Sequence, residues 1–275
     1  MGSDPTFGLY CYGSDPESIR GKMTFIIGYL IPFIFGTIIG SFLNVCIFRL
    51  PKKQSIVSPS SYCPNCNHPI KFYNNIPILS FLFLRGKCSN CGEPISFRYL
   101  VVELLAGLLS LALFLKFGLS LSYFVYLAFS ASLLVITFID LDHQIIPDVI
   151  TLPGIILGFA ASLFLPGMTF MDSIIGIAAG GGGLFLVAMG YKFLAKREGM
   201  GAGDIKLISM IGAFLGIKGV LLTIFLGSLF GSSVGLTIML KEKRDRRYAV
   251  PFGPFLAIGA IIYIFWGEII VRRYL

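Results

Sequence analysis

Charged residues are scarce in this sequence. Only 13% of its 275 residues are Asp, Glu, Lys or Arg, whereas 56% are hydrophobic, and the mean hydropathy is +0.84. This scarcity excludes a soluble globular domain, in which about a quarter of the residues are charged. Apolar runs of about 20 residues recur, and each can cross a hydrocarbon layer roughly 30 Å thick as a helix. The sequence therefore predicts an all-α polytopic membrane protein.

Histidine is nearly absent, because His68 and His143 are the only two in the chain. The sequence contains neither H-E-x-x-H, the zinc signature of many metalloproteases, nor G-x-S-x-G, the nucleophile signature of serine hydrolases. Residues 49–99 also lack a G-x-G-x-x-G after a strand, the fingerprint of a Rossmann-type nucleotide site. These absences leave the acidic residues as the main candidates for chemistry.

The apolar runs divide the chain into about eight transmembrane helices. We interpret residues 1–22 as a tag, because Gly-Ser-Asp-Pro occurs twice within them and Met23 opens the first apolar run; a native polar extension is the alternative. A first helix is expected at 23–48, a loop domain at 49–99 and a membrane domain at 100–275. The expected spans are 24–48, 100–117, 121–139, 149–165, 172–194, 205–217, 219–240 and 252–271.

Basic residues gather in three connecting segments. Cytoplasmic loops carry an excess of Lys and Arg, and eight spans place all three segments on one side. We therefore expect the amino terminus outside and the 49–99 loop on the cytoplasmic face, although Arg272 and Arg273 are a counter-signal. The net charge of +8 then reflects topology and attraction to membrane lipid, so no nucleic-acid partner is expected. The basic residues are Arg49, Lys52, Lys53, Lys71, Arg85, Lys87 and Arg98; Lys196, Arg197 and Lys206; and Lys241, Lys243, Arg244, Arg246 and Arg247.

Four cysteines form two C-x-x-C pairs in the 49–99 loop, Cys63 with Cys66 and Cys88 with Cys91. This spacing is typical of structural zinc held by four thiolates. Two disulfides or idle thiols are the alternatives, and a reducing cytoplasm disfavours disulfides. His68 is an alternative ligand. Four sulfur ligands leave no open coordination position, so the zinc would stabilise the loop rather than hydrolyse a substrate.

Two groups of acids occur at the edges of apolar runs. Asp140 follows the run that ends at Ile139, and Asp204 lies within G-M-G-A-G-D-I-K at residues 199–206. We expect Asp204 in the first turn of a membrane helix, where the helix dipole favours a negative charge, and a cap without chemistry is the alternative. Ionisable groups at a bilayer are costly and mark functional sites. We therefore name Asp140 and Asp204 as partners.

Other acids close to Asp140 receive structural interpretations. A helix that ends near Ile139 leaves Asp142 and His143 further from the bilayer. Pro147 blocks the continuation of a helix, and Asp148 after it is expected as a cap or first-turn acid of the next span.

Three further polar residues remain ambiguous. Glu103 is expected as a first-turn acid, with a group that meets a positive charge on a substrate as the alternative. Asn44, near the end of the first span, and Lys206, just after Asp204, carry the same ambiguity between structure and function.

Two neighbouring carboxylates support a specific chemistry. They do not both ionise readily, so they share one proton. One then acts as a base on water and the other as an acid toward a substrate carbonyl, as in aspartic proteases. Asp140 and Asp204 are thus the candidate catalytic pair of an aspartic endopeptidase. An ion-coupled membrane transporter that uses the same pair and a zinc-ribbon scaffold are the alternatives.

Taken in order, these motifs resemble the bacterial type IV prepilin peptidases, which are membrane aspartic proteases of the GxGD type. The resemblance covers essentially the whole chain from Met23. It matches Asp140 and Asp204 to the two catalytic aspartates of the family. The motifs that carry it are G-S-F-L-N-V at 40–45 leading to R-L-P at 49–51, the paired cysteine knuckles, Asp140 seven residues before Pro147, the signature G-M-G-A-G-D-I-K with Gly201, Gly203 and Lys206, and P-F-G-P-F at 251–255.

The resemblance implies an activity, partners and a location. The expected substrates are type IV prepilins or pseudopilins, which serve pili and protein secretion, and their basic leader is cleaved after a glycine at the cytoplasmic face of the bacterial inner membrane. Members with the cysteine-bearing loop commonly also methylate the new amino terminus with S-adenosylmethionine. No residue of the loop can be assigned to that methyl donor from the sequence. Gly176 and the glycines at 180–183 are expected to allow close contacts, either with a substrate helix or within the bundle.

Overall fold

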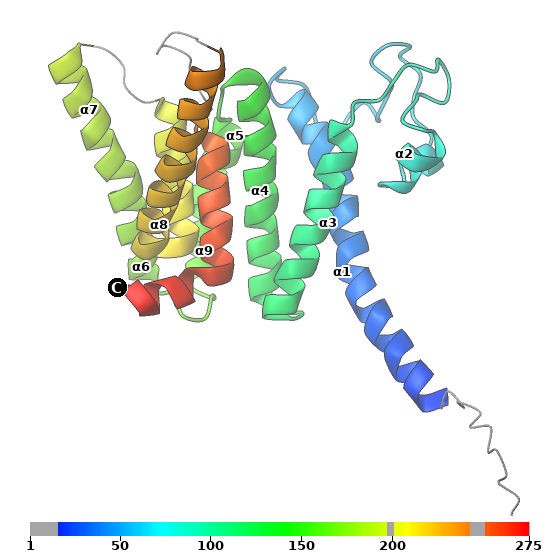
Figure 1. Cartoon of the computed structure of the whole chain (residues 1–275), viewed down its shortest axis with the longest axis horizontal. Helices are drawn as coiled ribbons and strands as arrows, with labels where there is room; N and C mark the ends of the chain where they lie inside the picture. The colour runs from blue at the N-terminus through cyan, green and yellow to red at the C-terminus, as the bar shows by residue number, and fades with distance from the viewer. Residues whose placement is uncertain (1–15, 197–200, 243–250, 275) are drawn as a thin grey trace, which may run out of the picture.

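The chain folds as a bundle of helices (Figure 1). The computed structural model describes residues 16–196, 201–242 and 251–274, and within them extended backbone pairs only as two isolated bridges. This confirms the predicted all-α fold; the predicted tag lies mostly in residues 1–15, outside the described part. The helices are α1 (Pro16–Arg49), η1 (Phe72–Asn75), α2 (Leu79–Phe83), α3 (Arg98–Phe117), α4 (Leu121–His143), α5 (Asp148–Ser162), α6 (Phe170–Ile177), η2 (Ala178–Gly182), α7 (Gly183–Ala195), α8 (Ala202–Glu242) and α9 (Gly253–Tyr274).

Six helical segments among the described residues are long and apolar enough to cross a membrane. The expected number was about eight, and the difference arises at two places. The helix α5 has only 15 residues, fewer than the roughly 20 needed to cross the hydrocarbon layer. The two spans expected at 205–217 and 219–240 both fall within α8, which counts once. All eight expected apolar segments are nevertheless helical.

The helix α8 reverses its direction at Gly216. This residue has φ 67° and ψ −174°, a conformation that is essentially restricted to glycine. The second arm then runs antiparallel to α9, since Gly227 packs against Leu256 and Gly219 against Tyr263. In Figure 1 the yellow first arm of α8 and its orange second arm accordingly lie beside α9.

Two clusters of buried side chains hold the bundle together, and α4 contributes to both. The larger joins α4 to α8 and α9, with Phe129 stacked on Phe214 at 4.4 Å between ring centroids. The smaller joins α4 to α1 and α3 through residues such as Leu43 and Val102. The helix α4 therefore links the part that carries the cysteine loop to the part that carries α8.

Glycines permit close helix contacts at two crossings. A Cβ atom at Gly40 in α1 would lie 2.7 Å from the Cα atom of Glu103 in α3. Gly176 in α6 meets the backbone of Gly212 in α8, and Gly180 and Gly181 also face α8. These glycines therefore serve the protein's own packing. Gly182 and Gly183, by contrast, have open space where a Cβ would lie.

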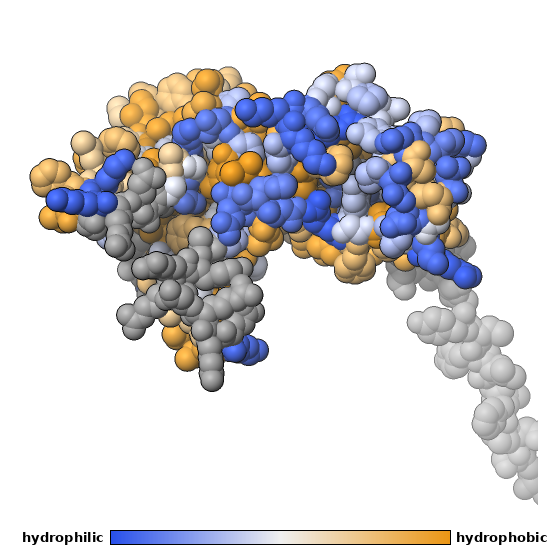
Figure 2. Space-filling view, turned by 90° about the horizontal axis from the view of Figure 1, so that it is seen from above, coloured by the Kyte–Doolittle hydropathy of each residue, from blue (hydrophilic) through white to orange (hydrophobic). Residues whose placement is uncertain are grey.

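Polar residues gather at one end of the bundle. Figure 1 places the α1–α3 loop there, and Figure 2, which views that end, shows hydrophilic residues spread across it. The labelled carboxyl end of the chain lies at the opposite end. Of the basic residues used to predict orientation, Arg197, Lys243, Arg244, Arg246 and Arg247 lie outside the described residues.

Candidate active site and metal centre

Asp140 lies in the last turns of α4 and is buried, with 5% of its surface exposed. The helix continues to His143 rather than ending near Ile139, because Gln144 adopts a left-handed conformation and donates its N–H to the Asp140 carbonyl at 2.9 Å. The expected helix end was therefore wrong by about one turn. Asp142 and His143 belong to the same helix as Asp140.

The Asp140 carboxylate accepts a hydrogen bond from the backbone of α9. The N–H of Gly253 donates to its Oδ2 atom at 2.9 Å. Gly253 is the first residue of α9, where unpaired N–H groups and the helix dipole attract negative charge. A Cβ atom at Gly253 would lie only 2.7 Å from this oxygen. The sequence placed Gly253 in the closing motif but offered no signal for this contact.

Asp204 lies in the first turn of α8, as predicted. Its backbone N–H donates to the Gly201 carbonyl at 3.2 Å. The Asp204 and Asp140 side chains are close enough to interact electrostatically. The start of α8 and the end of α4 thus place the two carboxylates that the sequence named as partners within electrostatic range of each other.

The two described glycines of the signature loop, Gly201 and Gly203, differ in how much space they leave for a side chain. A Cβ atom at Gly203 would lie 2.9 Å from the Cβ atom of Ile146, so this glycine lets α8 begin directly against the chain before α5. At Gly201 a Cβ atom would be 3.5 Å from Oδ2 of Asp204, which is an ordinary contact. Gly199 and Met200 lie outside the described residues.

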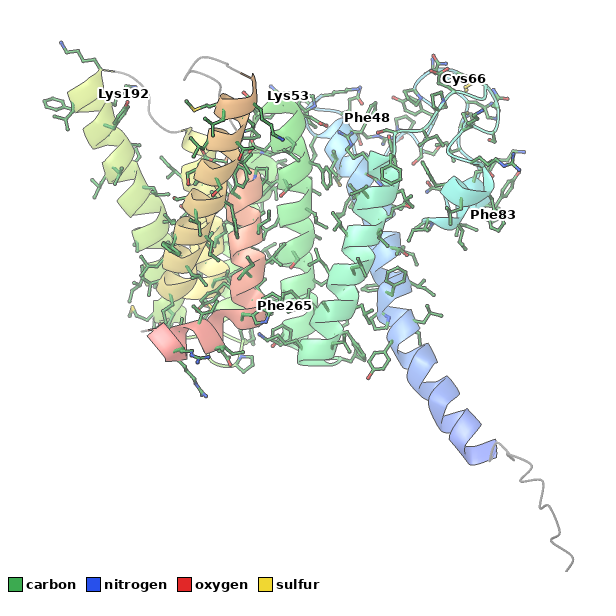
Figure 3. All side chains as sticks on the ribbon, in the orientation of Figure 1. Phe48, Lys53, Cys66, Phe83, Lys192 and Phe265 are labelled. Carbon is green, nitrogen blue, oxygen red and sulfur yellow. The ribbon has the colours of Figure 1, made fainter. Side chains whose placement is uncertain are left out.

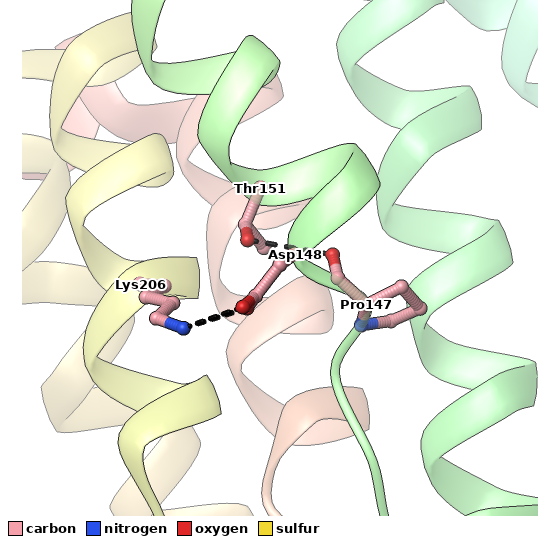
Figure 4. Close-up of polar contacts among 4 residues, drawn as sticks. All are labelled: Pro147, Asp148, Thr151 and Lys206. Carbon is pink, nitrogen blue, oxygen red and sulfur yellow. Dashed lines mark hydrogen bonds and ion pairs between the residues drawn. The ribbon is translucent and has the colours of Figure 1, made fainter. Parts of the chain in front are cut away.

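Lys206 of the signature loop binds a different acid. Its Nζ atom lies 2.7 Å from Oδ1 of Asp148, which stands in the first turn of α5 after Pro147 (Figure 4). The expected position of Asp148 is thus confirmed. The two side chains are 35% and 55% exposed, so the pair contributes at most about 1 kcal/mol. It ties the start of α8 to the start of α5.

Asp142 forms an ion pair with Arg98 at the start of α3. Both side chains are partly exposed. This pair connects α4 to α3 at the surface and holds Asp142 in a contact separate from the Asp140 and Asp204 pair.

Glu103 is not the first-turn acid that was expected. The helix α3 begins at Arg98, so Glu103 occupies its second turn, and only 8% of its surface is exposed. It accepts the N–H of Ile78 at 2.7 Å and a hydrogen bond from Ser41. Asn44 similarly donates to the Tyr99 carbonyl at 3.1 Å. Asn44 therefore joins α1 to α3, and Glu103 joins α3 to both α1 and the cysteine loop.

Cys63, Cys66, Cys88 and Cys91 form one cluster, in which all four sulfur atoms lie within 4.8 Å of one another. Zinc–sulfur bonds of 2.3 Å in a tetrahedron place the sulfur atoms about 3.8 Å apart, and the Sγ atoms of Cys63 and Cys91 are 3.9 Å apart. This separation excludes a disulfide between them, whose bond is about 2.05 Å. His68 is not a member of the cluster.

The two C-x-x-C knuckles, at residues 63–66 and 88–91, share one pattern of backbone hydrogen bonds. The N–H of Cys63 donates to the His68 carbonyl at 3.0 Å, and the N–H of Cys88 donates to the Glu93 carbonyl at 2.8 Å. Asn67 and Gly92 take positive φ angles of 54° and 72° at equivalent places. Each knuckle thus curls its N–H groups around the sulfur atoms.

The electrostatics of the cluster suit a cation. N–H groups of Cys91 and Asn90 lower the pKa of the Cys88 thiol to about 6. The pKa of Cys91 is lowered by the Glu93 N–H, but burial and the neighbouring sulfur atoms outweigh this effect and raise it to about 11. Thiolates crowded together repel one another, and a bound cation relieves that repulsion. The geometry and the donor set therefore fit a metal ion.

Comparisons with known proteins agree with this arrangement. Residues 34–117 match the bacterial peptidase A24 N-terminal domain, and residues 127–236 match the type IV leader peptidase family. Similar curated proteins named prepilin leader peptidase/N-methyltransferase come from Aeromonas hydrophila, 37% identical over 90% of this chain and 93% of that protein, and Pseudomonas aeruginosa, 38% identical over 90% and 93%. One from Myxococcus xanthus is 42% identical over 77% of this chain and 63% of that protein. No solved structure matches the chain.

These similarities extend over both the loop region and the helices that carry Asp140 and Asp204. Relatives that are more than 35% identical over about nine-tenths of both chains share one fold and one ancestry. This chain therefore belongs to the type IV leader peptidase family.

Proposed function

We propose that this chain removes the leader peptide from prepilins with Asp140 and Asp204 as its catalytic pair, and then methylates the new amino terminus. The single observation that carries the site assignment is that these two acids, one near the end of α4 and one at the start of α8, lie within electrostatic range of each other. Family membership supports a peptidase with methyltransferase activity and does not support the transporter alternative.

The surroundings of the two acids favour different roles. A hydrogen bond to the ionised form of a carboxylate stabilises that form, and the Gly253 N–H donates such a bond to Asp140. Asp204 also accepts a backbone N–H, that of Gly201 in its own turn, whereas the bond to Asp140 comes from the start of a second helix, α9; on this difference we assign the shared proton to Asp204. Asp140 takes a proton from the attacking water, while Asp204 gives its proton to the carbonyl oxygen of the scissile peptide.

The position of the pair suits a substrate that is itself anchored in the membrane. Asp140 lies near the end of one membrane helix and Asp204 in the first turn of another. A prepilin with an apolar helix would present its cleavage site at that depth without leaving the bilayer. This relation supports type IV prepilins or pseudopilins as substrates, cut after a glycine at the cytoplasmic face of the bacterial inner membrane.

The four-cysteine cluster supports a structural role for zinc. Cys63, Cys66, Cys88 and Cys91 would hold the ion and leave no position open for substrate. The methyl group would come from S-adenosylmethionine, as the name N-methyltransferase of the relatives implies.

We divide the chain into a tag at 1–22, a first transmembrane helix at 23–48, a zinc-binding loop domain at 49–99 and a peptidase domain at 100–275.

The proposal is tested with a type IV prepilin and the purified enzyme in lipid nanodiscs, followed by mass spectrometry of the products. We expect the wild type to remove the leader and, with S-adenosylmethionine present, to add one methyl group. Asp140→Asn and Asp204→Asn should each lower the cleavage rate by at least about 1,000-fold, because each removes one proton-transfer group.

Asp142→Asn is the matched control on the same helix. Asp142 is engaged by Arg98 at the surface, so this variant should cleave at close to the wild-type rate. Rapid cleavage by a folded Asp204→Asn variant would refute the assignment of the pair. An inactive but folded Asp142→Asn variant would show that the wrong acid of α4 was chosen.

A further inference from the structure

A cavity of about 300 Å³ lies between the end of α1 and the cysteine loop. Figure 3 shows the loop, marked by Cys66 and Phe83, beside the end of α1, marked by Phe48. The α1 side of the cavity includes Ser41 and Val45, and the loop side includes Ser60 and Asn75. Its volume is at the lower end of the range for small-molecule sites, and its wall of apolar residues with a few polar groups is typical of them.

A buried cation forms part of the wall. Arg49 lines the cavity and is only 4% exposed. Its guanidinium donates to the carbonyls of Ser55 at 3.0 Å and Ser60 at 3.3 Å. Among the described residues no carboxylate pairs with it. A buried charge is normally paired, and a guanidinium has five N–H donors that suit a carboxylate.

The acidic side chain of Glu103 lies behind the wall of the same cavity. Ser41 lines it and hydrogen bonds to the buried Glu103. Pro77 also lines it, and the next residue, Ile78, donates its N–H to Glu103. The site therefore offers a cation at Arg49 and, behind Ser41, the carboxyl group of Glu103. A zwitterionic amino acid group with a further positive centre complements this pair.

We propose that this cavity binds the methyl donor S-adenosylmethionine, with Arg49 facing the carboxylate of its methionine part and the Glu103 side facing its positively charged groups. This inference rests on the methyltransferase part of the proposed function. It assigns the donor to the junction of α1 with the cysteine loop, separate from Asp140 and Asp204. The cysteine knuckles then support one wall of the site.

Binding of S-adenosylhomocysteine, the demethylated product, to the full-length protein in nanodiscs is measured by calorimetry. Val45→Trp fills the cavity from α1, and Arg49→Gln removes its cation. Each substitution should raise the Kd of the probe by at least about tenfold. In each variant the fold-change in Kd should exceed the fold-change in the rate of prepilin cleavage. Two variants are needed because Arg49→Gln also removes the hydrogen bonds to Ser55 and Ser60, whereas Val45→Trp leaves those bonds in place.

The matched controls lie on the same part of the chain. Ile31→Trp adds the same ring to a side of α1 where the native side chain is 62% exposed. Lys52→Gln removes a charge that stacks on Phe48 outside the cavity wall. Both controls should bind the probe as the wild type does.

The outcomes separate this inference from the proposed function. Unchanged binding in folded Val45→Trp and Arg49→Gln overturns the cavity assignment while the methyltransferase stands. A wild type that cleaves prepilin but neither binds the probe nor methylates overturns both the assignment and the methyltransferase. Native mass spectrometry distinguishes a lipid phosphate as the occupant: loss of a copurifying phospholipid in Arg49→Gln, with probe binding intact, also overturns the assignment.

Discussion

Asp140 depends on a glycine that is distant in sequence. The Gly253 N–H reaches Oδ2 of Asp140 across a separation of 113 residues. The absence of a side chain at Gly253 is as important as the N–H, because a Cβ atom would press on the same oxygen at 2.7 Å. This contact orients the carboxylate that we assign as the base.

Gly253→Ala should therefore impair catalysis without unfolding the protein. The added methyl group displaces the Asp140 carboxylate, and we expect the cleavage rate at saturating substrate to fall by about 10-fold to 100-fold. Steady-state kinetics with a prepilin should show a much smaller change in KM. Gly190→Ala is the control, since a Cβ atom there meets nothing within 4 Å. Wild-type kinetics for Gly253→Ala would contradict the positioning role.

Among the helices, α8 carries the most distinctive local geometry. Its first arm begins at the signature loop and packs against α5 and α6, and its second arm returns along α9. The reversal at Gly216 has a backbone conformation open only to glycine. This single residue therefore determines how the second arm folds back beside the first arm, which carries Asp204.

Gly216→Ala should destabilise the bundle. The strained backbone costs about 1–3 kcal/mol, which thermal unfolding in detergent would register as a lower midpoint. Gly235→Ala in the same helix is the matched control, because its Cβ atom meets nothing within 4 Å and alanine favours a helix interior by up to about 1 kcal/mol. Equal midpoints for the two variants would show that the reversal tolerates a side chain.

The whole molecule consists of two helical groups joined through α4. The cysteine loop and α1, which line the cavity, belong with α3 to one group, whereas α8 and α9, which carry Asp204 and Gly253, belong to the other. Cleavage and methylation are therefore expected to respond differently to damage on one side. Removing the metal from the cysteine cluster would perturb the first group without changing a residue of the second.

Removal of the metal should impair methylation more than cleavage. The purified protein is expected to contain one zinc ion, measured by elemental mass spectrometry, and Cys63→Ser or a chelator should lower that content. Without the ion the knuckles loosen, because a structural metal contributes directly to folding, and hydrogen exchange in residues 49–97 should increase. Cys46→Ala is the control, since this buried cysteine lies outside the cluster. Equal loss of both activities would indicate a general folding role instead.

Several properties followed from the sequence alone because they depend on local patterns. The apolar runs predicted the helical segments, since the cost of burying a polar backbone in lipid forces each run into a helix. The C-x-x-C spacing predicted the four-cysteine cluster. The polar break before Ile205 predicted Asp204 in a first helical turn. The order of motifs also identified the family.

Other properties depend on tertiary contacts that no local pattern encodes. The Gly253 contact to Asp140 joins α9 to α4, and the Ile78 contact to Glu103 joins the loop to α3. Glu103 was placed in the first turn because the start of α3 was expected two residues later than it is. Arg49 was counted as a basic loop residue and as part of the R-L-P motif at 49–51, with no contact assigned to it, yet packing against the loop buries it. Hydropathy and spacing report on neighbours along the chain, whereas these contacts arise only when separate helices pack together.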